Sequence, residues 1–276
     1  MNSIITIPLC SEIYKLPIWE SDPILFFASG ALTENHFHFH FIYLYNYMYI
    51  IILIAILICL MIHLKRRVLR VHDRRVFKDE KEHIVPHLSV EREEQINIYE
   101  QVDKGDKVLE LGARYGTVSA ILMDMVYKEN DVVIVEPDAA VINVLYKNLR
   151  DNGFKNPNIF HGTVGYSKKK MSDGDGYAIQ TVDCEGGDCG IESLRYTDLQ
   201  DRYNIVFDTI VADCEGCLPD TINHILDFYP LLKPIKKIIF ETDYEDRVDY
   251  TTMYNTLTNL GFTNTKKGFI QVWRKF

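Results

Sequence analysis

Acidic and thiol side chains gather in two short segments of the chain. Residues 213–217 read Asp-Cys-Glu-Gly-Cys, and residues 183–190 begin with the same four residue types. Carboxylates can take up protons or bind a hard cation, and four thiolates can bind zinc. The repeated tetrapeptide therefore indicates one shared metal site, an internal repeat, or a single working motif with a coincidental copy.

Other carboxylates stand where apolar runs of strand length end. Such runs precede Glu110, Glu136, Asp213 and Glu241, and a further run precedes His161. In an open α/β sheet, ligands bind outside the carboxyl ends of the strands. We therefore expect these side chains to lie along one edge of a sheet, where a ligand would bind.

The elements that position these residues alternate between strand and helix from Val90 onward. Apolar runs bounded by turn residues predict strands at residues 106–111, 131–137, 156–162, 206–213 and 236–243. Amphipathic stretches predict helices at residues 90–102, 117–128, 138–153 and 218–232, and the tail reads as a helix followed by two strands. Residues 167–190 are polar and glycine-rich, which predicts a loop or an irregular hairpin. This alternation is typical of a mostly parallel α/β sheet.

Two glycines, Gly112 and Gly116, lie where the first predicted strand turns into a helix. Glycine allows a tight turn and lets the backbone approach a ligand closely. The pattern is not the Gly-x-Gly-x-x-Gly of dinucleotide-binding proteins. Glu136 ends the second strand 20 residues after Gly116, where a carboxylate can accept hydrogen bonds from both ribose hydroxyls. Together these features predict an adenosine-containing cofactor without a pyrophosphate.

Four segments of the chain resemble motifs of one enzyme family. Residues 106–119, DKVLELGARYGTVS, resemble the first motif of class I S-adenosylmethionine-dependent methyltransferases, and in detail that of the FkbM family. Residues 132–153 resemble the second motif, residues 211–216 the Asp-x-Glu-Gly motif and residues 238–243 the fifth-strand motif. The resemblance covers the chain from about Val90 to its end. It implies a Rossmann-like class I α/β fold with a mostly parallel seven-stranded sheet, and S-adenosylmethionine as the cofactor.

The resemblance also implies a role for each residue of the first motif. The residues that would wrap the methionine end of the cofactor are Gly112, Ala113, Arg114, Tyr115 and Gly116. Glu110 would lie near the amino group of the cofactor, and Glu136 would hold the ribose. The alternatives are packing beneath the loop for Tyr115 and solvated strand-end carboxylates for the two glutamates.

The carboxylates after the fourth and fifth strands are the candidate catalytic residues. Methyl transfer is an in-line displacement, so catalysis depends largely on aligning the nucleophile, methyl and sulfur in a dry pocket. We expect Asp213 to contact the cofactor or the substrate, and Glu215 or Glu241 to orient a hydroxyl and take its proton. His161 is either a structural residue or a base. Carboxylates gathered at strand ends could also bind a divalent cation, but we predict no metal because their spacing matches no known carboxylate loop.

Four cysteines flank the acidic residues of the two similar segments. Cys184 and Cys189 are five positions apart, and Cys214 and Cys217 form a Cys-x-x-Cys pattern. Four thiolates could hold a tetrahedral zinc ion, which we keep as the minority interpretation. The family resemblance accounts for the acids without the cysteines, a cytosol-facing domain disfavours a disulfide, and a redox pair lacks a thioredoxin-like context.

An uncharged apolar run precedes the predicted domain. Residues 41–64 contain no Asp, Glu, Lys or Arg and are long enough to cross a bilayer as one helix. Tyrosines near its start resemble an interfacial belt, which argues against a buried core helix. The length and acidity of the preceding segment argue against a cleaved signal peptide, and the basic residues directly after the run should keep the C-terminal body in the cytosol. We divide the chain into a non-cytosolic segment 1–40, a transmembrane helix 41–64, a basic juxtamembrane linker 65–89 and a methyltransferase domain 90–276.

The charge of the chain argues against some classes of binding partner and favours others. The formal net charge is −9, and residues 95–276 carry 20 Lys and Arg against 28 Asp and Glu. This balance argues against a nucleic-acid partner, whereas the basic stretch after the span suits anionic lipid headgroups. We expect a membrane-anchored methyltransferase acting on a hydroxyl of a sugar, a glycan or another small molecule, with the hydroxyl preference implied by the resemblance. The alternative is a non-catalytic S-adenosylmethionine-binding or scaffold module tethered to a membrane.

Overall fold

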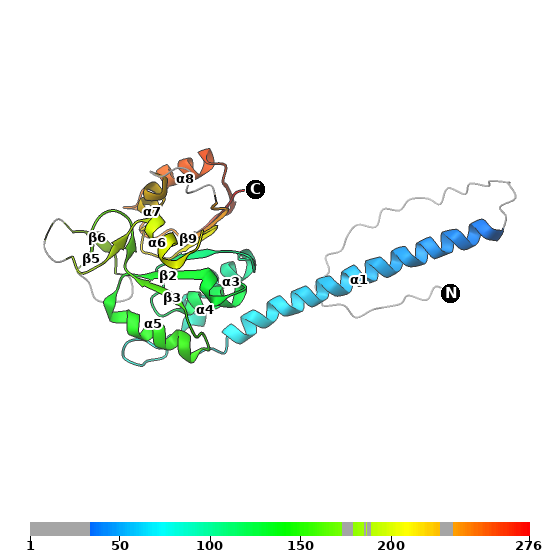
Figure 1. Ribbon diagram of the computed structural model, residues 1–276, viewed down its shortest axis with the longest axis horizontal. Helices are drawn as coiled ribbons and strands as arrows, with labels where there is room; N and C mark the ends of the chain where they lie inside the picture. Colours follow the sequence, from blue (N-terminus) through cyan, green and yellow to red (C-terminus); the bar gives the residue numbers. More distant parts are fainter. Residues whose placement is uncertain (1–33, 173–178, 185, 187–188, 227–233) are drawn as a thin grey trace. The chain divides into compact units, whose positions relative to one another are not determined.

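The computed structural model describes residues 34–172, 179–184, 186, 189–226 and 234–276 (Figure 1). The chain divides into two units, Met1–Leu57 and Ile58–Phe276, which are described separately. The first 33 residues of the predicted N-terminal segment 1–40 lie outside the described residues.

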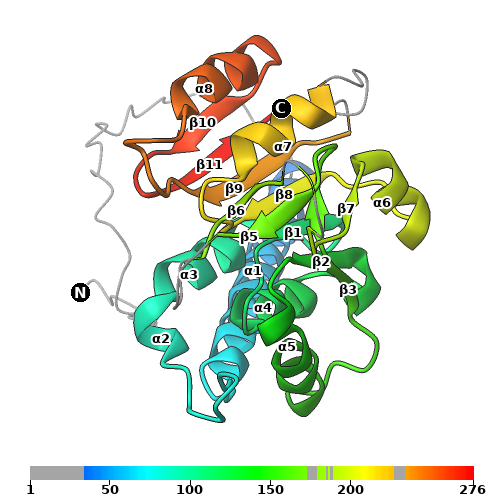
Figure 2. The same ribbon diagram turned by 90° about the vertical axis from the view of Figure 1, so that its left-hand side faces the viewer.

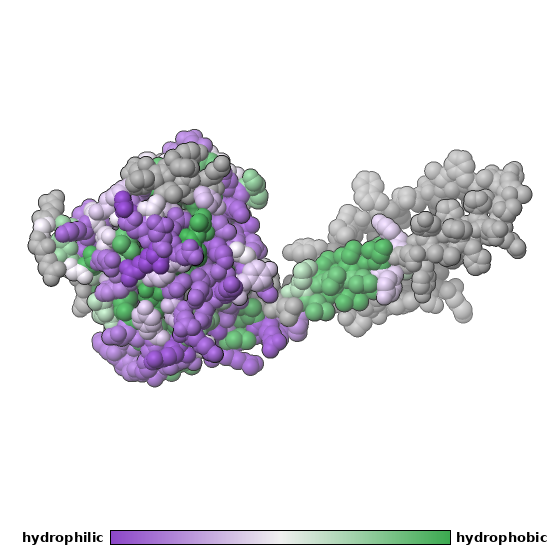
Figure 3. Space-filling model, in the orientation of Figure 1, coloured by the Kyte–Doolittle hydropathy of each residue, from purple (hydrophilic) through white to green (hydrophobic). Residues whose placement is uncertain are grey.

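Helix α1 (Glu34–His72) contains the predicted transmembrane run. Within its stretch Tyr47–His72, an 18-residue window has a mean hydropathy of 2.7, and the stretch is long and apolar enough to cross a membrane, by length and composition. Side chains from Tyr47 to Met61 are exposed, and Figure 3 shows them as a continuous apolar surface. One apolar helix is therefore a candidate membrane span, overlapping the predicted residues 41–64.

A seven-stranded sheet forms the centre of the second unit. Its spatial order is β3-β2-β1-β8-β9-β11-β10, and all neighbouring pairs are parallel except those made by β11. The strands are β1 (Val108–Leu111), β2 (Val132–Glu136), β3 (Asn158–His161), β8 (Thr209–Ala212), β9 (Lys237–Glu241), β10 (Thr263–Lys266) and β11 (Ile270–Arg274). The order reverses between β1 and β8, as in doubly wound folds. The Rossmann-like α/β fold with a mostly parallel sheet, predicted from the sequence, is thus confirmed.

Helices cover both faces of the sheet (Figure 2). Helices α3 (Arg92–Gln101), α4 (Thr117–Met125) and α5 (Ala139–Asp151) cover one face, and α6 (Tyr196–Tyr203), α7 (Leu218–Leu226) and α8 (Tyr250–Asn259) cover the other. Alternate residues of β1 point to opposite layers, Val108 to the first and Leu109 to the second. Because every residue of β1 and β2 is buried, these strands appear in the sequence as apolar runs in which Glu110 and Glu136 are the two charged residues.

Short elements complete the domain. They are α2 (His87–Val90), the 3-10 turn η1 (Glu129–Asp131), β4 (Thr163–Val164), β5 (Lys169–Met171), β6 (Thr181–Asp183) and β7 (Ser193–Leu194). Strands β5 and β6 pair antiparallel, so the polar segment 167–190 contains the irregular hairpin that its composition allowed.

The segment 65–89, assigned from its charge to a linker, also contributes to the domain. It continues α1 to His72 and then places Phe77 and Val85 in the core layer formed by α3, α4 and α5. Arg75 forms an ion pair with Asp124 of α4 at 2.5 Å. These contacts all lie within the second unit, to which the end of α1 belongs.

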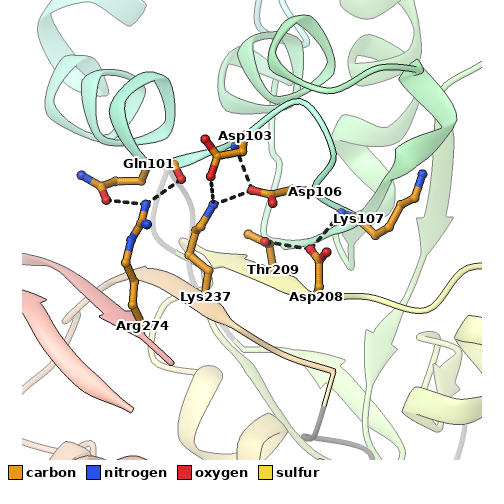
Figure 4. Close-up of polar contacts among 8 residues, drawn as sticks. All are labelled: Gln101, Asp103, Asp106, Lys107, Asp208, Thr209, Lys237 and Arg274. Atoms are coloured by element: carbon orange, nitrogen blue, oxygen red, sulfur yellow. Dashed lines mark hydrogen bonds and ion pairs between the residues drawn. The ribbon is translucent and has the colours of Figure 1, made fainter. Parts of the chain in front are cut away.

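A polar cluster lies at the amino ends of β8 and β9 (Figure 4). The side chain of Lys237 is 6% exposed, and its Nζ lies 2.5 Å from Asp106 Oδ2 and 3.2 Å from Asp103 Oδ2. Arg274 of β11 donates hydrogen bonds to the backbone and the side chain of Gln101 at the end of α3. We call this group, Gln101, Asp103, Asp106, Lys237 and Arg274, the amino-edge cluster.

Candidate functional site

A cavity of about 190 Å³ lies at the carboxyl ends of β1, β2 and β8. The turn after β1, the end of β2 and the segment after β8 form its floor, while the β5–β6 hairpin and the start of α3 complete the wall. This is the point where the strand order reverses, the usual place for a ligand in an open α/β sheet. A cavity therefore lies at the edge of the sheet where we expected a ligand to bind.

The turn after β1 depends on Gly112. Its φ of +80° is left-handed, and a Cβ at this position would lie 1.8 Å from the carbonyl oxygen of Asp213. The Gly112 amide donates to Val135, and the Asp213 amide donates to Leu111. The turn after β1 and the segment after β8 are therefore in direct backbone contact, which only glycine permits.

Glu136, at the end of β2, binds the same turn. Its Oε2 accepts hydrogen bonds from the amides of Ala113 at 3.0 Å and Arg114 at 2.7 Å, and its Oε1 accepts from Asp138 at 2.8 Å. Burial raises the pKa of this carboxyl, and the three hydrogen bonds oppose the rise. Glu136 lines the cavity, as a ribose-binding residue must, and it also holds the turn in place.

Glu110 lies beneath this turn and does not line the cavity. It is 1% exposed, and burial raises the pKa of its carboxyl to about 8. The Ser119 hydroxyl opposes the rise but does not complete a hydrogen bond with good geometry, so both carboxylate oxygens lack a partner among the described residues. A buried acid without a partner suits a site that a cationic group completes.

The remaining residues of the first motif divide into two groups. Ala113 and Arg114 line the cavity, whereas Tyr115 and Gly116 do not. The Tyr115 hydroxyl donates to Glu80 at 2.8 Å, and its ring is 5% exposed. Gly116 is the N-cap of α4 with a φ of +80°. The structure therefore favours the packing alternative for Tyr115.

The structure brings the predicted acids after β8 and β9 close together. Asp213 and Glu215 line the cavity, and one carboxylate oxygen each of Asp213, Glu241 and Glu94 lie within 4.8 Å of one another. Burial and the neighbouring acids raise the pKa of Asp213 well above its ordinary value and that of Glu241 to about 7.

Glu94 is a site residue that the sequence analysis did not identify. It lies in the first turn of α3, is 3% exposed and lines the cavity. The helical period of the sequence could have indicated that Glu94 is buried. Glu94 stands four positions before the fully buried Ile98, so the two side chains lie on the same face of the helix.

The β5–β6 hairpin covers one side of the cavity. Lys169, Met171 and Gln180 line it, and Gln180 Nε2 donates to the Glu215 carbonyl at 2.7 Å. Residues 173–178 of the hairpin lie outside the described residues. His161 is exposed and does not line the cavity, and its Nε2 lies 3.2 Å from the Pro137 carbonyl oxygen. Its position supports the structural interpretation of this histidine.

The four cysteines form two local disulfides, Cys184–Cys189 and Cys214–Cys217. The minority interpretation, a shared tetrahedral zinc site, is therefore wrong for this structure, because each sulfur is already paired within its own segment. We expected no disulfides because a cytosolic location disfavours them, and this expectation was wrong. Cys214 and Cys217 line the cavity, whereas the segment with Cys184 and Cys189 does not.

The cavity is strongly acidic. Among the described residues, seven carboxylate residues line it, against two cationic ones, Arg114 and Lys169. The carboxylates are Glu91, Glu94, Glu136, Asp138, Asp213, Glu215 and Asp220. This balance favours a ligand that carries positive charge over one that carries phosphate groups.

Comparisons with known proteins show similarity in fold. No protein-family model matches the chain, and no curated protein sequence does. A precorrin-6y C5,15-methyltransferase from Geobacter metallireducens GS-15 aligns with a TM-score of 0.44 and 12% identity over 70% of this chain and 93% of its own. Methyltransferase FkbM from Methylobacillus flagellatus KT aligns with a TM-score of 0.42 and 15% identity, over 63% of this chain and 44% of its own.

A third similar structure contains a bound cofactor. It is a candidate tRNA (m1A22) methyltransferase from Streptococcus pneumoniae in complex with S-adenosyl-L-methionine, with a TM-score of 0.38 and 13% identity over 66% of this chain and 72% of its own. At these identities and scores the similarity concerns the general fold only.

Proposed function

We propose that the protein is a membrane-anchored, S-adenosylmethionine-dependent methyltransferase. The observation that carries this proposal is the cavity at the reversal point of the sheet, which the Gly112 turn, Glu136 and Asp213 line together. These are three positions that the sequence motifs assign to the cofactor. The acidic lining suits a ligand with a sulfonium and an ammonium group and no phosphate.

The residues present fit this cofactor. The Gly112–Arg114 turn would hold its methionine end and Glu136 its ribose. Buried Glu110 does not line the cavity and has no hydrogen-bond partner among the described residues, so it would pair with the ammonium group by losing its proton when the cofactor binds. When bound, the cofactor supplies a methyl group activated by sulfonium charge. The chain supplies the floor made by the β1 and β8 turns and a wall made by the β5–β6 hairpin, which together limit water around the reacting atoms.

We propose a hydroxyl on a sugar, a glycan or another small molecule as the acceptor. Asp213 and Glu215 line the cavity beyond the cofactor turn, so an acceptor hydroxyl there can donate a hydrogen bond to either carboxylate. Glu215, or Glu241 through its contact with Asp213, would take the proton as the methyl is transferred. Burial raises the pKa of Glu215, which makes its carboxylate a better proton acceptor.

Calorimetry on the full-length protein in a non-ionic detergent tests the cofactor assignment. We expect S-adenosylmethionine and its demethylated product to bind in the micromolar range. Glu136→Ala should abolish binding and Glu136→Gln should weaken it at least tenfold, whereas Glu100→Ala, an exposed acid on α3, should not change it. No binding by the unaltered chain would refute the assignment. Binding without methyl transfer to glycan, lipid and small-molecule panels would instead favour the scaffold alternative.

We propose that α1 anchors the domain and that the domain faces the cytosol. The apolar run of α1 and the basic residues after it support this orientation. In sealed vesicles of known sidedness, a protease added to the cytosolic face should digest the C-terminal domain without detergent. Digestion only from the opposite face would reverse the orientation.

A further inference from the structure

Three carboxylates from three elements converge beside the cavity. They are Glu94 from α3, Asp213 from the segment after β8 and Glu241 from the end of β9, and one oxygen from each lies within 4.8 Å of the others. Like charges at this separation repel, so the arrangement destabilises the ionised site unless a positive group occupies it.

The protein itself supplies no such positive group among the described residues. No lysine, arginine or histidine in that part of the chain forms an ion pair with any of the three carboxylates. Lys169, on the cavity wall, is paired with Asp183 at 2.9 Å. The three acids therefore differ from the amino-edge cluster, where Lys237 neutralises two aspartates.

Glu94 gives an independent indication of a ligand. Its side chain is 3% exposed, its Oε2 has no hydrogen-bond partner among the residues that the structure describes, and it points at Asp213 and Glu241. A position in the first turn of a helix favours an acid through the helix dipole, but Glu93 in the same turn is exposed and reaches Lys266 at 3.7 Å. The dipole therefore does not explain why Glu94 is buried against two other acids, since a buried charge requires a partner or a metal.

We propose that Glu94, Asp213 and Glu241 form a binding site for a hard divalent cation such as Mg²⁺, Mn²⁺ or Ca²⁺. Such cations prefer carboxylate oxygens, and two oxygens bound to one Ca²⁺ can lie up to about 5 Å apart, which the observed separation satisfies. Asp243, two residues beyond Glu241, adds a further buried oxygen that has no hydrogen-bond partner in the described part of the chain. Because Asp213 and Glu94 also line the cavity, the cation would be accessible to an acceptor there.

The catalytic role of this cation rests on the proposed methyl transfer, whereas its binding does not. A cation at this position would coordinate the acceptor hydroxyl and lower its pKa, so that the alkoxide forms more readily. Asp213 and Glu241 would then act as ligands, which leaves Glu215 to accept the proton.

The test is equilibrium binding of Mn²⁺ to the full-length protein in non-ionic detergent, without cofactor, followed by electron paramagnetic resonance of free Mn²⁺. After chelator treatment and removal of the chelator, we expect one Mn²⁺ per chain, displaced by excess Mg²⁺ or Ca²⁺. Glu94→Gln and Glu241→Gln should each weaken binding at least tenfold. Glu93→Gln is the matched control, with the same loss of charge in the same helical turn, and should change binding less than twofold.

Absence of a stoichiometric Mn²⁺ site, or equal binding by Glu94→Gln and Glu93→Gln, would overturn the proposal. Both glutamine variants keep the shape of the side chain and remove repulsion, so the chelated proteins should fold with unchanged near-ultraviolet circular dichroism. If the cluster only receives the ammonium group of the cofactor, Mn²⁺ will not bind and Glu94→Gln will weaken S-adenosylmethionine binding, which also overturns it. Failure of the cofactor assignment would appear separately, as Mn²⁺ binding by a protein that does not bind S-adenosylmethionine.

Discussion

At the scale of single residues, Gly112 determines how closely two parts of the site can approach. The carbonyl of Asp213 occupies the space that any larger residue at position 112 would need for its Cβ. The glycine is thus required by backbone packing as well as by its left-handed φ.

Gly112→Ala should lower the free energy of unfolding by about 3 kcal/mol, because the new methyl overlaps backbone atoms that cannot move independently. Gly105→Ala is the control, since its added Cβ meets no atom within 4 Å, and it should change stability by less than about 0.5 kcal/mol. Chemical denaturation of both variants measures the difference. Equal stability of the two variants would contradict the close approach.

The raised pKa of Glu110 predicts that the stability of the folded protein decreases as the pH rises. Its pKa is about 8 in the folded protein against 4.5 when unperturbed, so the folded state retains a proton that the unfolded state has lost. Stability from this residue is therefore fully present below about pH 4.5 and is lost as pH rises towards 8, by up to about 1.4 kcal/mol per pH unit.

The glutamine of Glu110→Gln cannot ionise. With divalent cations removed by a chelator, the free energy of unfolding of this variant should therefore fall less steeply from pH 4.5 to 8 than that of the unaltered chain. At pH 8 the free energy of unfolding of the variant should exceed that of the unaltered chain by up to about 4 kcal/mol. Glu100→Gln controls for the loss of one exposed charge. An identical pH slope with and without Glu110 would show that this carboxyl ionises normally.

The motifs tie Asp213, Glu215 and Glu136 to strand ends, and all three line the cavity. Spacing along a turn does not say which side chains face a cavity, so the sequence left two interpretations of Tyr115 open. Glu94 was missed because a charged residue in a helical pattern is normally assigned to the solvated face.

At the scale of elements, β1 and β2 were predictable because burial on both faces makes all their residues apolar except Glu110 and Glu136. Helix α6 and strands β4 and β7 were not predicted, since they are short and contain alternating polar residues. The sequence also did not indicate that Phe77 is buried, because the basic residues around it are typical of a solvated linker.

The amino-edge cluster should stabilise the sheet unequally through its two aspartates. Asp106 is 14% exposed and accepts from both Lys237 and the Asp103 amide, whereas Asp103 is 66% exposed. Asp106→Asn should therefore lower the unfolding free energy by about 3 kcal/mol by leaving Lys237 poorly neutralised. Asp103→Asn removes the same charge at the surface and should change it by less than about 1 kcal/mol. Similar losses in thermal or chemical unfolding of the two variants would argue against a buried pair.

At the scale of the whole molecule, the two disulfides and the proposed cytosolic orientation indicate different compartments for the domain. Disulfides persist in oxidising compartments and are rare in the cytosol, yet the basic residues after α1 favour a cytosolic domain. Composition and hydropathy predicted an apolar helix long enough to span a membrane, but the pairing of cysteines depends on distances that spacing alone does not give.

Both disulfides should be found in protein purified without reductant. Alkylation before and after reduction, followed by mass spectrometry, should show four cysteines protected before reduction in the pairs Cys184–Cys189 and Cys214–Cys217. The single cysteine on α1, Cys59, is not paired and provides the internal alkylation control. Alkylation of all of them without reduction would show that the domain matures in a reducing compartment.

The contact between Gly112 and Asp213 has a thermodynamic consequence for the two ligands proposed above. The cofactor would bind the turn that contains Gly112 and the cation would bind Asp213, and these segments are joined by backbone contact and hydrogen bonds. Occupancy of one position should therefore change affinity at the other. Linkage requires the two effects to be equal: the factor by which Mn²⁺ changes the dissociation constant of the cofactor must equal the factor by which the cofactor changes that of Mn²⁺.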